Sequence, residues 1–177
     1  MNIRPATSSD TQQIAEVHIA SQRHGFRGYV CQNYLDELDA SKRAIFWWKF
    51  FEREERNPGY TLVSTDENGN ITGLTNGFPT DTEGLFHIKL LYIHPDHMNQ
   101  GLGGELLSTL ISQVKKDGYT QVGLEILVDN IIAKNFYQKY GLQECGEPYI
   151  YYKPDRKPLP GINGEPAMVI KMIKDIS

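Results

Sequence analysis

The stretch that most constrains the fold is residues 85–116, in which an extended apolar run passes directly into a helical one. Residues 85–94 are predicted to form a long strand, and Pro95 stops it because proline has no N–H to donate to a neighbouring strand. A glycine-rich turn follows, and the apolar spacing over residues 103–116 predicts a helix that is closed at Gly118. A strand that turns at once into a helix is typical of α/β folds.

The other elements follow from the same kinds of pattern. Apolar runs bounded by turn residues predict strands at residues 2–6, 60–64, 71–78, 122–128, 143–152 and 167–173. Helical spacing predicts helices at residues 11–22, 32–56 and 131–140. The pair Asn68-Gly69 predicts a hairpin turn between the second and third strands, and Asn57-Pro58-Gly59 is expected to end the helical region before them.

The predicted elements run in the order β-α-α-β-β-β-α-β-α-β-β. Three strands in succession form a meander, and the later strands alternate with helices. This order predicts an α/β (α+β) fold with a central mixed, twisted sheet of about 6–7 strands and helices on both faces. A chain of 177 residues is long enough for one domain with a sizeable core, so we expect a single domain over residues 1–177.

Net charge and hydropathy exclude several classes of protein. The formal charge is -4, whereas a nucleic-acid binder needs a basic surface to meet phosphates, so no nucleic-acid partner is expected. No run approaches the roughly 18 apolar residues of a membrane span, and the N-terminus lacks the apolar segment of a signal peptide. We therefore expect a cytoplasmic protein with no membrane partner.

Cysteine and histidine spacing predicts neither a disulfide framework nor a metal site. The chain has two cysteines, Cys31 and Cys145, which are too few for a disulfide framework in a chain of this length, and we expect them to be reduced thiols. His94 and His97 lie three residues apart without a nearby cysteine, which a loop is enough to explain. No metal is therefore expected.

Residues 94–104 carry the strongest chemical signal. They are His94-Pro95-Asp96-His97-Met98-Asn99-Gln100-Gly101-Leu102-Gly103-Gly104. A glycine-rich turn between a strand and a helix N-terminus points several backbone N–H groups at one place, which suits a pyrophosphate. The segment is not a G-x-G-x-x-G fingerprint and lacks the Lys-Ser/Thr of a P-loop, so taken alone it leaves a plain tight turn as the alternative.

A second block gives this turn its context. It has the form Asn130-x-x-Ala133-x-x-x-Tyr137-x-x-x-Gly141-Leu142. Together the two blocks, which lie within residues 85–142, resemble the acyl-CoA motifs of the GNAT N-acetyltransferase superfamily. The resemblance implies an acetyl-CoA-dependent enzyme that acetylates a primary amine by direct attack in a ternary complex. The amine would belong to a small molecule, a protein N-terminus or a lysine.

The resemblance also implies roles for individual residues. Backbone groups of Leu91, Tyr92 and Ile93 would meet the pantetheine arm and the thioester carbonyl. Asn130 would bond the pantetheine or phosphate region, and Tyr137 would protonate the thiolate of CoA, unless it is only a core aromatic of its helix. The pyrophosphate would be held by the amides of Asn99, Gln100, Gly101, Leu102, Gly103 and Gly104.

One position departs from the family pattern. The family usually has Gln or Arg as the first residue of the pyrophosphate block, and this chain has Met98 there, preceded by His97. Because backbone amides do most of the binding, losing one polar side chain, worth roughly 1–3 kcal/mol, should weaken CoA affinity rather than abolish it. Whether His97 substitutes stays open.

The acceptor amine is almost entirely protonated at pH 7, so a base must take its proton before it attacks. Glu125 matches the position of the acid in the branch of the family that acetylates ribosomal-protein N-termini. His87 lies where histone-type members carry a glutamate, and its ordinary pKa near 6.5 suits a base. The alternative is that a water chain or another residue takes the proton. Glu125 would then only face solvent, and His87 would only pack on the sheet.

Two segments are expected to wall the acceptor, because the family uses its first helices and its final hairpin there. In this chain they are Phe26-Arg27-Gly28-Tyr29 and the tyrosines Tyr149, Tyr151 and Tyr152. Tyrosine rings suit an amine through cation–π contact, although ordinary packing explains them equally well. A further apolar group is either a core face on the sheet or an aromatic wall beside the acceptor, or both: Ile45, Phe46, Trp47, Trp48, Phe50 and Phe51.

The main alternative from another class is a non-catalytic CoA-binding or regulatory domain on the same fold. Such a domain would keep the pyrophosphate loop and lose Tyr137 or the base, whereas this chain keeps Tyr137. A homodimer is possible, since dimers are common in the family. The identity of the amine is not written in the sequence.

Overall fold

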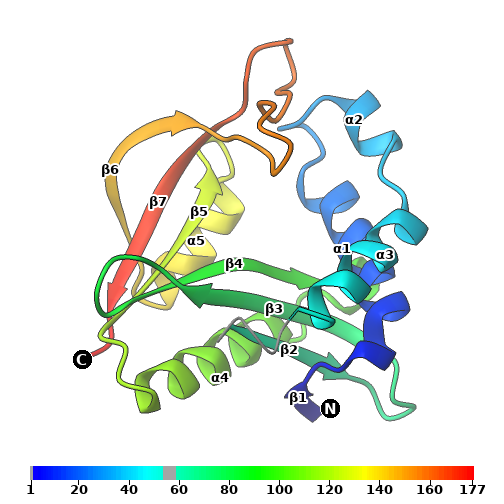
Figure 1. Cartoon of the computed structure of the whole chain (residues 1–177). Helices are drawn as coiled ribbons and strands as arrows, with labels where there is room; N and C mark the ends of the chain where they lie inside the picture. Colours follow the sequence, from blue (N-terminus) through cyan, green and yellow to red (C-terminus); the bar gives the residue numbers. More distant parts are fainter. Residues whose placement is uncertain (1, 54–58) are drawn as a thin grey trace.

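A seven-stranded mixed sheet organises the chain (Figure 1). The computed structural model describes residues 2–53 and 59–177. The strand order is β1-β2-β3-β4-β5-β7-β6, and only the central pair β4–β5 is parallel. The strands are β1 (Asn2–Pro5), β2 (Tyr60–Thr65), β3 (Ile71–Pro79), β4 (Leu85–Ile93), β5 (Gln121–Leu127), β6 (Gln143–Ile150) and β7 (Met168–Asp175).

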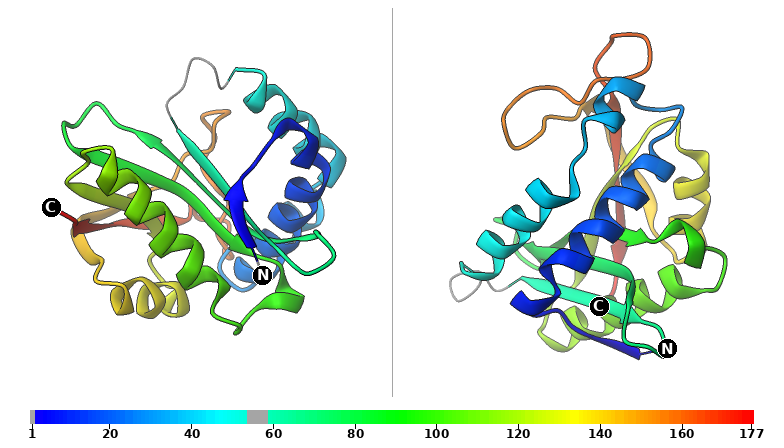
Figure 2. Two further views of the ribbon diagram at one scale, coloured as in Figure 1. Left: turned by 90° about the horizontal axis from the view of Figure 1, so that it is seen from below. Right: turned by 90° about the vertical axis from the view of Figure 1, so that its right-hand side faces the viewer.

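Helices cover both faces of the sheet, as the order of elements predicted (Figure 2). They are α1 (Thr11–Gly25), α2 (Gln32–Asp36), α3 (Ala40–Phe51), α4 (Leu102–Lys116) and α5 (Ile131–Lys139), with short 3-10 turns η1 (Ser8–Asp10) and η3 (Pro95–His97). On one face α4 and α5 pack over a core that includes Phe86, Leu106 and Val122. On the other face α1 and α3 pack over a second core that includes Ile14 and Leu74.

The helical region predicted at residues 32–56 is wrong as a single helix. Residues 37–39 separate α2 from α3, because Asp39 has an extended backbone (φ -128°, ψ 121°) that no helix can continue through. The Asp39 carboxylate accepts a hydrogen bond from the Lys42 amide at 2.9 Å and so caps a new helix. The helix also ends earlier than predicted, at Phe51 with Glu52 as its C-cap, and of the predicted end at Asn57-Pro58-Gly59 only Gly59 lies within the described residues.

The end of β4 is irregular in a way that divides its side chains between the two faces. Asn76 of β3 pairs with Leu90, but the next residue of β3, Gly77, pairs with Ile88, so Lys89 is the extra residue of a β-bulge. As a result Ile88 and Leu91 both pack on the α4 face. Leu90 and Tyr92 pack on the α1 face.

The two parallel strands at the centre of the sheet then separate. They pair only from Leu85 and Gln121 to His87 and Gly123. Beyond these residues β4 and β5 run apart, which leaves the β5-facing edge of β4 without a neighbouring strand. This opening lies between the two helical layers.

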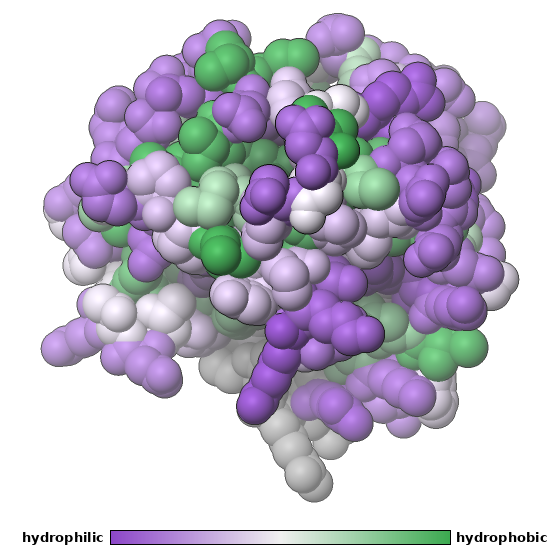
Figure 3. Space-filling model, turned by 90° about the horizontal axis from the view of Figure 1, so that it is seen from above, coloured by the Kyte–Doolittle hydropathy of each residue, from purple (hydrophilic) through white to green (hydrophobic). Residues whose placement is uncertain are grey.

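A third apolar cluster closes one end of the opening. Leu35 of α2 and Leu127 of β5 are buried with Leu159 and Ala167, which belong to the long loop before β7. The Cys31 amide donates to the carbonyl of Pro160 at 2.9 Å and ties this loop to the start of α2. Viewed from above in Figure 3, apolar side chains (green) emerge among hydrophilic ones on this face.

Both cysteines, Cys31 and Cys145, are free thiols, as expected. Within the part of the chain that the structure describes, no helix has the length and apolar character needed to cross a membrane.

Candidate active site

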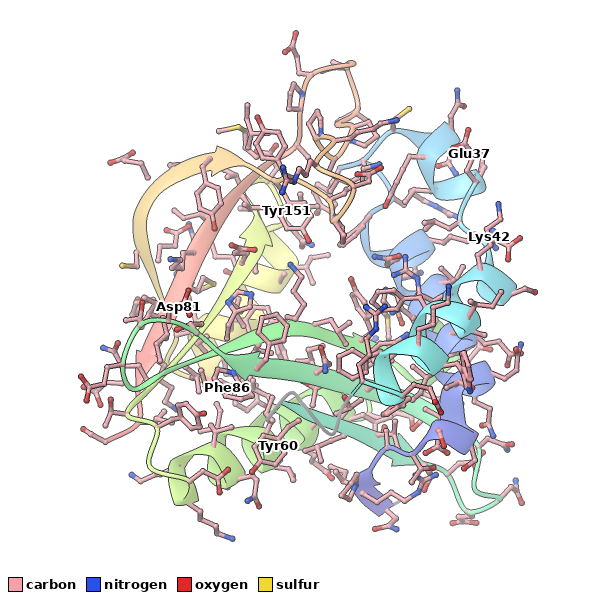
Figure 4. The ribbon with its side chains drawn as sticks, in the orientation of Figure 1. Glu37, Lys42, Tyr60, Asp81, Phe86 and Tyr151 are labelled. Carbon is pink, nitrogen blue, oxygen red and sulfur yellow. The ribbon has the colours of Figure 1, made fainter. Side chains whose placement is uncertain are left out.

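A cleft of about 1380 Å³ occupies the space where β4 and β5 separate. Its walls come from α1, α2 and α3 on one side, from the η3–α4 loop and α5 on the other, and from residues that follow β6. Figure 4 shows Tyr151 on the wall after β6, and Glu37 and Lys42 on the wall formed by α2 and α3. The cleft therefore collects most of the residues that the sequence singled out.

The glycine-rich turn forms one wall and presents unpaired N–H groups. Asn99 and Gly101 have left-handed backbones (φ 61° and 84°), and Gly101 is the N-cap of α4. Within residues 2–53 and 59–177, nothing accepts a hydrogen bond from the amides of residues 99–103. Five free amides at a helix N-terminus form a site for an anion.

Most of the predicted residues of this turn lie where an anion in the cleft could reach them, with two departures. Asn99, Gly101 and residues 102–104 line the cleft, and so do His97 and Met98. Gln100 is not among the described residues that line it. The Gly104 amide donates to the Gly101 carbonyl at 3.0 Å, so this amide, which the sequence predicted for the pyrophosphate, already has a partner.

Two neighbouring glycines of α4 have different reasons for being glycine. A Cβ atom on Gly104 would lie 1.8 Å from the hydroxyl oxygen of Tyr140, so the small residue lets α4 and α5 approach. A Cβ on Gly103 would meet Phe136 at 3.4 Å, an ordinary contact. Helix packing therefore requires glycine at position 104.

Strand β4 offers backbone groups to the opening. The His94 amide donates to the Thr72 carbonyl at 2.8 Å, and alternate residues of an antiparallel strand point to opposite edges. Tyr92 therefore pairs with β3, while the amide and carbonyl of Leu91 and Ile93 face the opening. The Ile93 carbonyl already accepts a hydrogen bond from the Ser21 hydroxyl at 2.8 Å, so the Ile93 amide and both backbone groups of Leu91 remain available.

Tyr137 reaches the cleft from α5. It packs on the α4-side core and its ring lies 5.0 Å from that of Phe136, yet it lines the cleft. Burial raises the pKa of Tyr137 well above its usual range, and the neighbouring phenol of Tyr92 adds to the effect. Its hydroxyl is therefore protonated at neutral pH.

Asn130 also lines the cleft, at the start of α5. Its side-chain oxygen accepts a hydrogen bond from the Ala133 amide at 3.0 Å and caps the helix. The oxygen thus has a structural partner, and the side-chain amide nitrogen is left for a ligand.

Glu125 and His87 lie near each other on neighbouring strands, but only Glu125 lines the cleft. Glu125 lines the cleft and accepts a hydrogen bond from the Tyr149 hydroxyl. His87 packs its ring 5.8 Å from Phe78 and is not among the described residues lining the cleft. Burial lowers the pKa of His87, and the Glu125 charge offsets part of that decrease.

A smaller cavity of about 540 Å³ adjoins the cleft and shares Lys89, Glu125 and Tyr151 with it. Tyr149 and Tyr152, expected in the acceptor wall, line this smaller cavity. Lys89 donates to the Tyr151 hydroxyl at 3.0 Å and its Nζ lies 5.0 Å from the centre of the ring. The chain's own lysine therefore already makes the cation–π contact that the sequence suggested for the substrate at Tyr151.

The wall built by α1, α2 and α3 includes residues that the sequence analysis missed, among them His18, Gln22, Tyr34 and Arg43. The expected residues Phe26, Arg27 and Tyr29 also line it. No motif marks His18 or Arg43. Only the polar side chains within otherwise apolar helix patterns could have drawn attention to them.

The apolar group on α3 divides between core and surface. Trp47 is 1% exposed and packs with Phe50 and Phe51, as a core face requires. Ile45 and Trp48 are 55% and 50% exposed, so a core role is wrong for them. Phe46 is 48% exposed and lines the cleft, which agrees with an aromatic wall.

Comparison with known proteins agrees with this geometry. The chain matches the family model described as "Acetyltransferase (GNAT) family" over residues 24–142. It is 30% identical over 139 residues to the L-amino acid N-acyltransferase MnaT of Escherichia coli (strain K12), covering 76% of this chain and 72% of that protein. It is 35% identical over 116 residues to the ribosomal protein bS18-alanine N-acetyltransferase of the same organism, covering 65% and 76%.

Solved structures share the fold. The PaiA N-acetyltransferase of Thermoplasma acidophilum, in complex with coenzyme A, aligns with a TM-score of 0.75 over 98% of each chain at 16% identity.

Proposed function

The chain belongs to the acetyltransferase (GNAT) family, and from this we propose that it transfers an acetyl group from acetyl-CoA to a primary amine by direct attack in a ternary complex. One observation carries the proposal. The free amides at the start of α4 open into the same cleft as Tyr137 and Glu125. A pyrophosphate site, an acid and a base thus share one volume.

Acetyl-CoA fits the donor side of this cleft. The amides of Asn99 and of residues 101–103 would bind its pyrophosphate, and the free edge of β4 would pair with the amides of the pantetheine arm. The Leu91 amide would stabilise the negative charge that develops on the thioester oxygen. Met98 offers no charge to the phosphates, so the backbone supplies most of that affinity.

Glu125 is the base that this geometry favours. An alkyl amine costs about 4.6 kcal/mol to deprotonate at pH 7, from an ordinary pKa near 10.4. Glu125 lines the cleft, and its hydrogen bond from Tyr149 fixes the position of its carboxylate. His87 is the weaker candidate, because burial lowers its pKa and it lies behind the cleft wall.

The reaction balances with these groups. Glu125 accepts one proton from the ammonium form of the acceptor, and the free amine forms an N–C bond with the acetyl carbon. The C–S bond breaks and Tyr137 donates a proton to the departing sulfur. The phenolate regains a proton from the nitrogen of the product, directly or through water, so the products are an N-acetyl amine, CoA and the proton held by Glu125.

A turnover assay tests this proposal. Release of free CoA thiol from acetyl-CoA is measured against a panel of amines for the wild type and for Tyr137→Phe. We expect release that depends on one class of amine and a kcat lower by about 100- to 1000-fold in the variant, with an unchanged Kd for CoA.

Two results would contradict it. Tight CoA binding without amine-dependent release would indicate the non-catalytic, regulatory alternative. No CoA binding would exclude the donor site itself.

A further inference from the structure

Arg43 is a half-buried cation in the acceptor wall without an anionic partner. It lies on the first turns of α3 and lines the cleft. Among the residues that the structure describes, no carboxylate forms an ion pair with it. Its guanidinium contacts the ring of Phe46, 5.5 Å from the ring centre.

Three of the four acidic side chains in the described lining of the cleft have other partners. Asp39 caps α3 through the Lys42 amide, and Asp155 lies 3.6 Å from Lys153. Glu125 accepts its hydrogen bond from Tyr149. Glu37 is exposed, on the outer end of α2.

The charge of Arg43 affects the pKa values of three side chains in the cleft wall. It contributes to the lowered pKa of His18 and opposes the rise that burial causes in the pKa values of Tyr34 and Tyr92. These three side chains come from α1, α2 and β4 and all line the cleft. Arg43 therefore shares one wall of the cleft with side chains from three other elements.

A second polar group in this wall lacks a partner. Gln22 donates from its side-chain nitrogen to the Tyr92 hydroxyl at 3.3 Å. Its side-chain oxygen is buried and has no hydrogen bond among the described residues. Gln22 lines the cleft, so a rotation of its side-chain amide would bring this oxygen to an N–H donor bound there.

We propose that the acceptor is an amine that also carries a carboxylate, of which a free α-amino acid is the simplest, and that Arg43 binds this carboxylate. The planar guanidinium forms two parallel hydrogen bonds with a carboxylate, and a half-buried site strengthens them. An ammonium group on the same molecule supplies a donor of the kind that the Gln22 oxygen lacks.

This inference rests on the proposed function and narrows it. One relative is named for L-amino acids and another for the N-terminal alanine of a ribosomal protein. A free amino acid has a carboxylate beside its amine, whereas a protein N-terminus has a peptide bond there. Arg43 therefore favours the first kind of acceptor for this chain.

The test compares each L-amino acid with its own carboxamide, which keeps the amine and the side chain but removes the negative charge. We measure kcat/KM of both with the wild type, Arg43→Gln and the control Lys49→Gln, which removes one charge from an exposed position of the same helix outside the cleft lining. For Arg43→Gln we expect a loss of about 10- to 100-fold on the free acid, mainly in KM. The loss on the carboxamide should stay below about 3-fold, and Lys49→Gln should change neither by more than that.

Binding is measured in parallel, so that the inference does not depend on turnover. Calorimetry of the CoA-bound protein with the best free amino acid and with its carboxamide should show tighter binding of the acid, and Arg43→Gln should abolish the difference. An equal loss on acid and carboxamide would overturn the inference, as would a wild type that prefers carboxamides or peptides. A higher Kd for CoA in Arg43→Gln would assign Arg43 to the donor instead.

Different results would overturn the acetyltransferase proposal and the role of Arg43. Amine-dependent CoA release that is equal for free acids and carboxamides would support the acetyltransferase activity and overturn the role of Arg43. Carboxylate-dependent binding without release with any amine would keep the role of Arg43 and overturn the acetyltransferase.

Discussion

At the scale of single residues, Gly104 shows how a missing side chain sets the distance between two helices. The Tyr140 hydroxyl lies in the space that a Cβ of residue 104 would fill, and the Tyr140 ring lies 5.0 Å from that of Phe136. A methyl group there would push Tyr140 away from Phe136. Residues of both helices line the cleft, so the same contact supports its shape.

Gly104→Ala should therefore lower the free energy of unfolding by about 1–3 kcal/mol through overpacking. Gly103→Ala is the matched control, because its Cβ would make only an ordinary contact and alanine favours a helix. Urea unfolding of both variants checks this, through midpoints at constant m value. Equal destabilisation by the two substitutions would contradict the packing argument.

At the scale of elements, a buried hydrogen bond joins α1 to α3. His18 is 4% exposed, and its Nδ1 accepts from the Trp47 indole N–H at 3.2 Å. This bond requires a neutral imidazole. Burial, with a smaller contribution from the charge of Arg43, lowers the pKa of His18 to about 3.

Stability should accordingly depend on pH through His18. Between pH 3 and the ordinary pKa of 6.5, the unfolded chain binds a proton at this residue that the folded chain does not. The stability is fully present above pH 6.5 and decreases as the pH falls, by at most about 1.4 kcal/mol per unit.

His18→Gln keeps a hydrogen-bond acceptor without a titrating group, so its slope should be shallower. Urea unfolding at several pH values from 5 to 7.5, where most carboxylates stay ionised, measures the difference. Identical slopes in the two proteins would show that His18 does not carry the effect.

At the scale of the whole molecule, the cleft is lined by helices from both layers and by both separated strands. A ligand that fills it contacts helices from both layers and both strands at once. Binding to the folded state alone should therefore stabilise the entire domain.

CoA at 100 times its Kd should raise the free energy of unfolding by about 2.7 kcal/mol, which corresponds to roughly 5–10 °C in Tm. Pantetheine at the same concentration should give a smaller shift, because it has no phosphates for the amides of residues 99–103. Thermal unfolding monitored by circular dichroism provides the measurement. A shift as large with pantetheine as with CoA would contradict the role of the turn.

Much of this architecture could be predicted because short stretches of the sequence determine it. Pro95 ends β4, and Asn68-Gly69 turns the β2–β3 hairpin, where Gly69 has a φ of 83°. The strand–turn–helix block and the Asn130–Tyr137 spacing likewise indicated the cleft residues on the donor side.

The remaining features depend on contacts between distant parts of the chain. The bulge at Lys89 exists only in the register with β3, and the bond between His18 and Trp47 spans 29 residues. Arg43 becomes notable only when α3 lies beside α1 and β4, since nothing in its neighbours along the chain sets it apart. The same holds for the break between α2 and α3, where a run of helix formers hid the cap at Asp39.

The bulge at Lys89 also determines where the length of β4 can change during evolution. Losing that one residue would place Leu90 directly after Ile88, and both would keep their present partners on β3. Leu91 and Tyr92 would therefore stay on their present faces, and the edge of β4 that faces the opening would not turn to β3. A deletion at this point should thus be better tolerated than one within β5, whose pairing with β7 contains no extra residue. Related chains that differ in length within the sheet should accordingly differ here first.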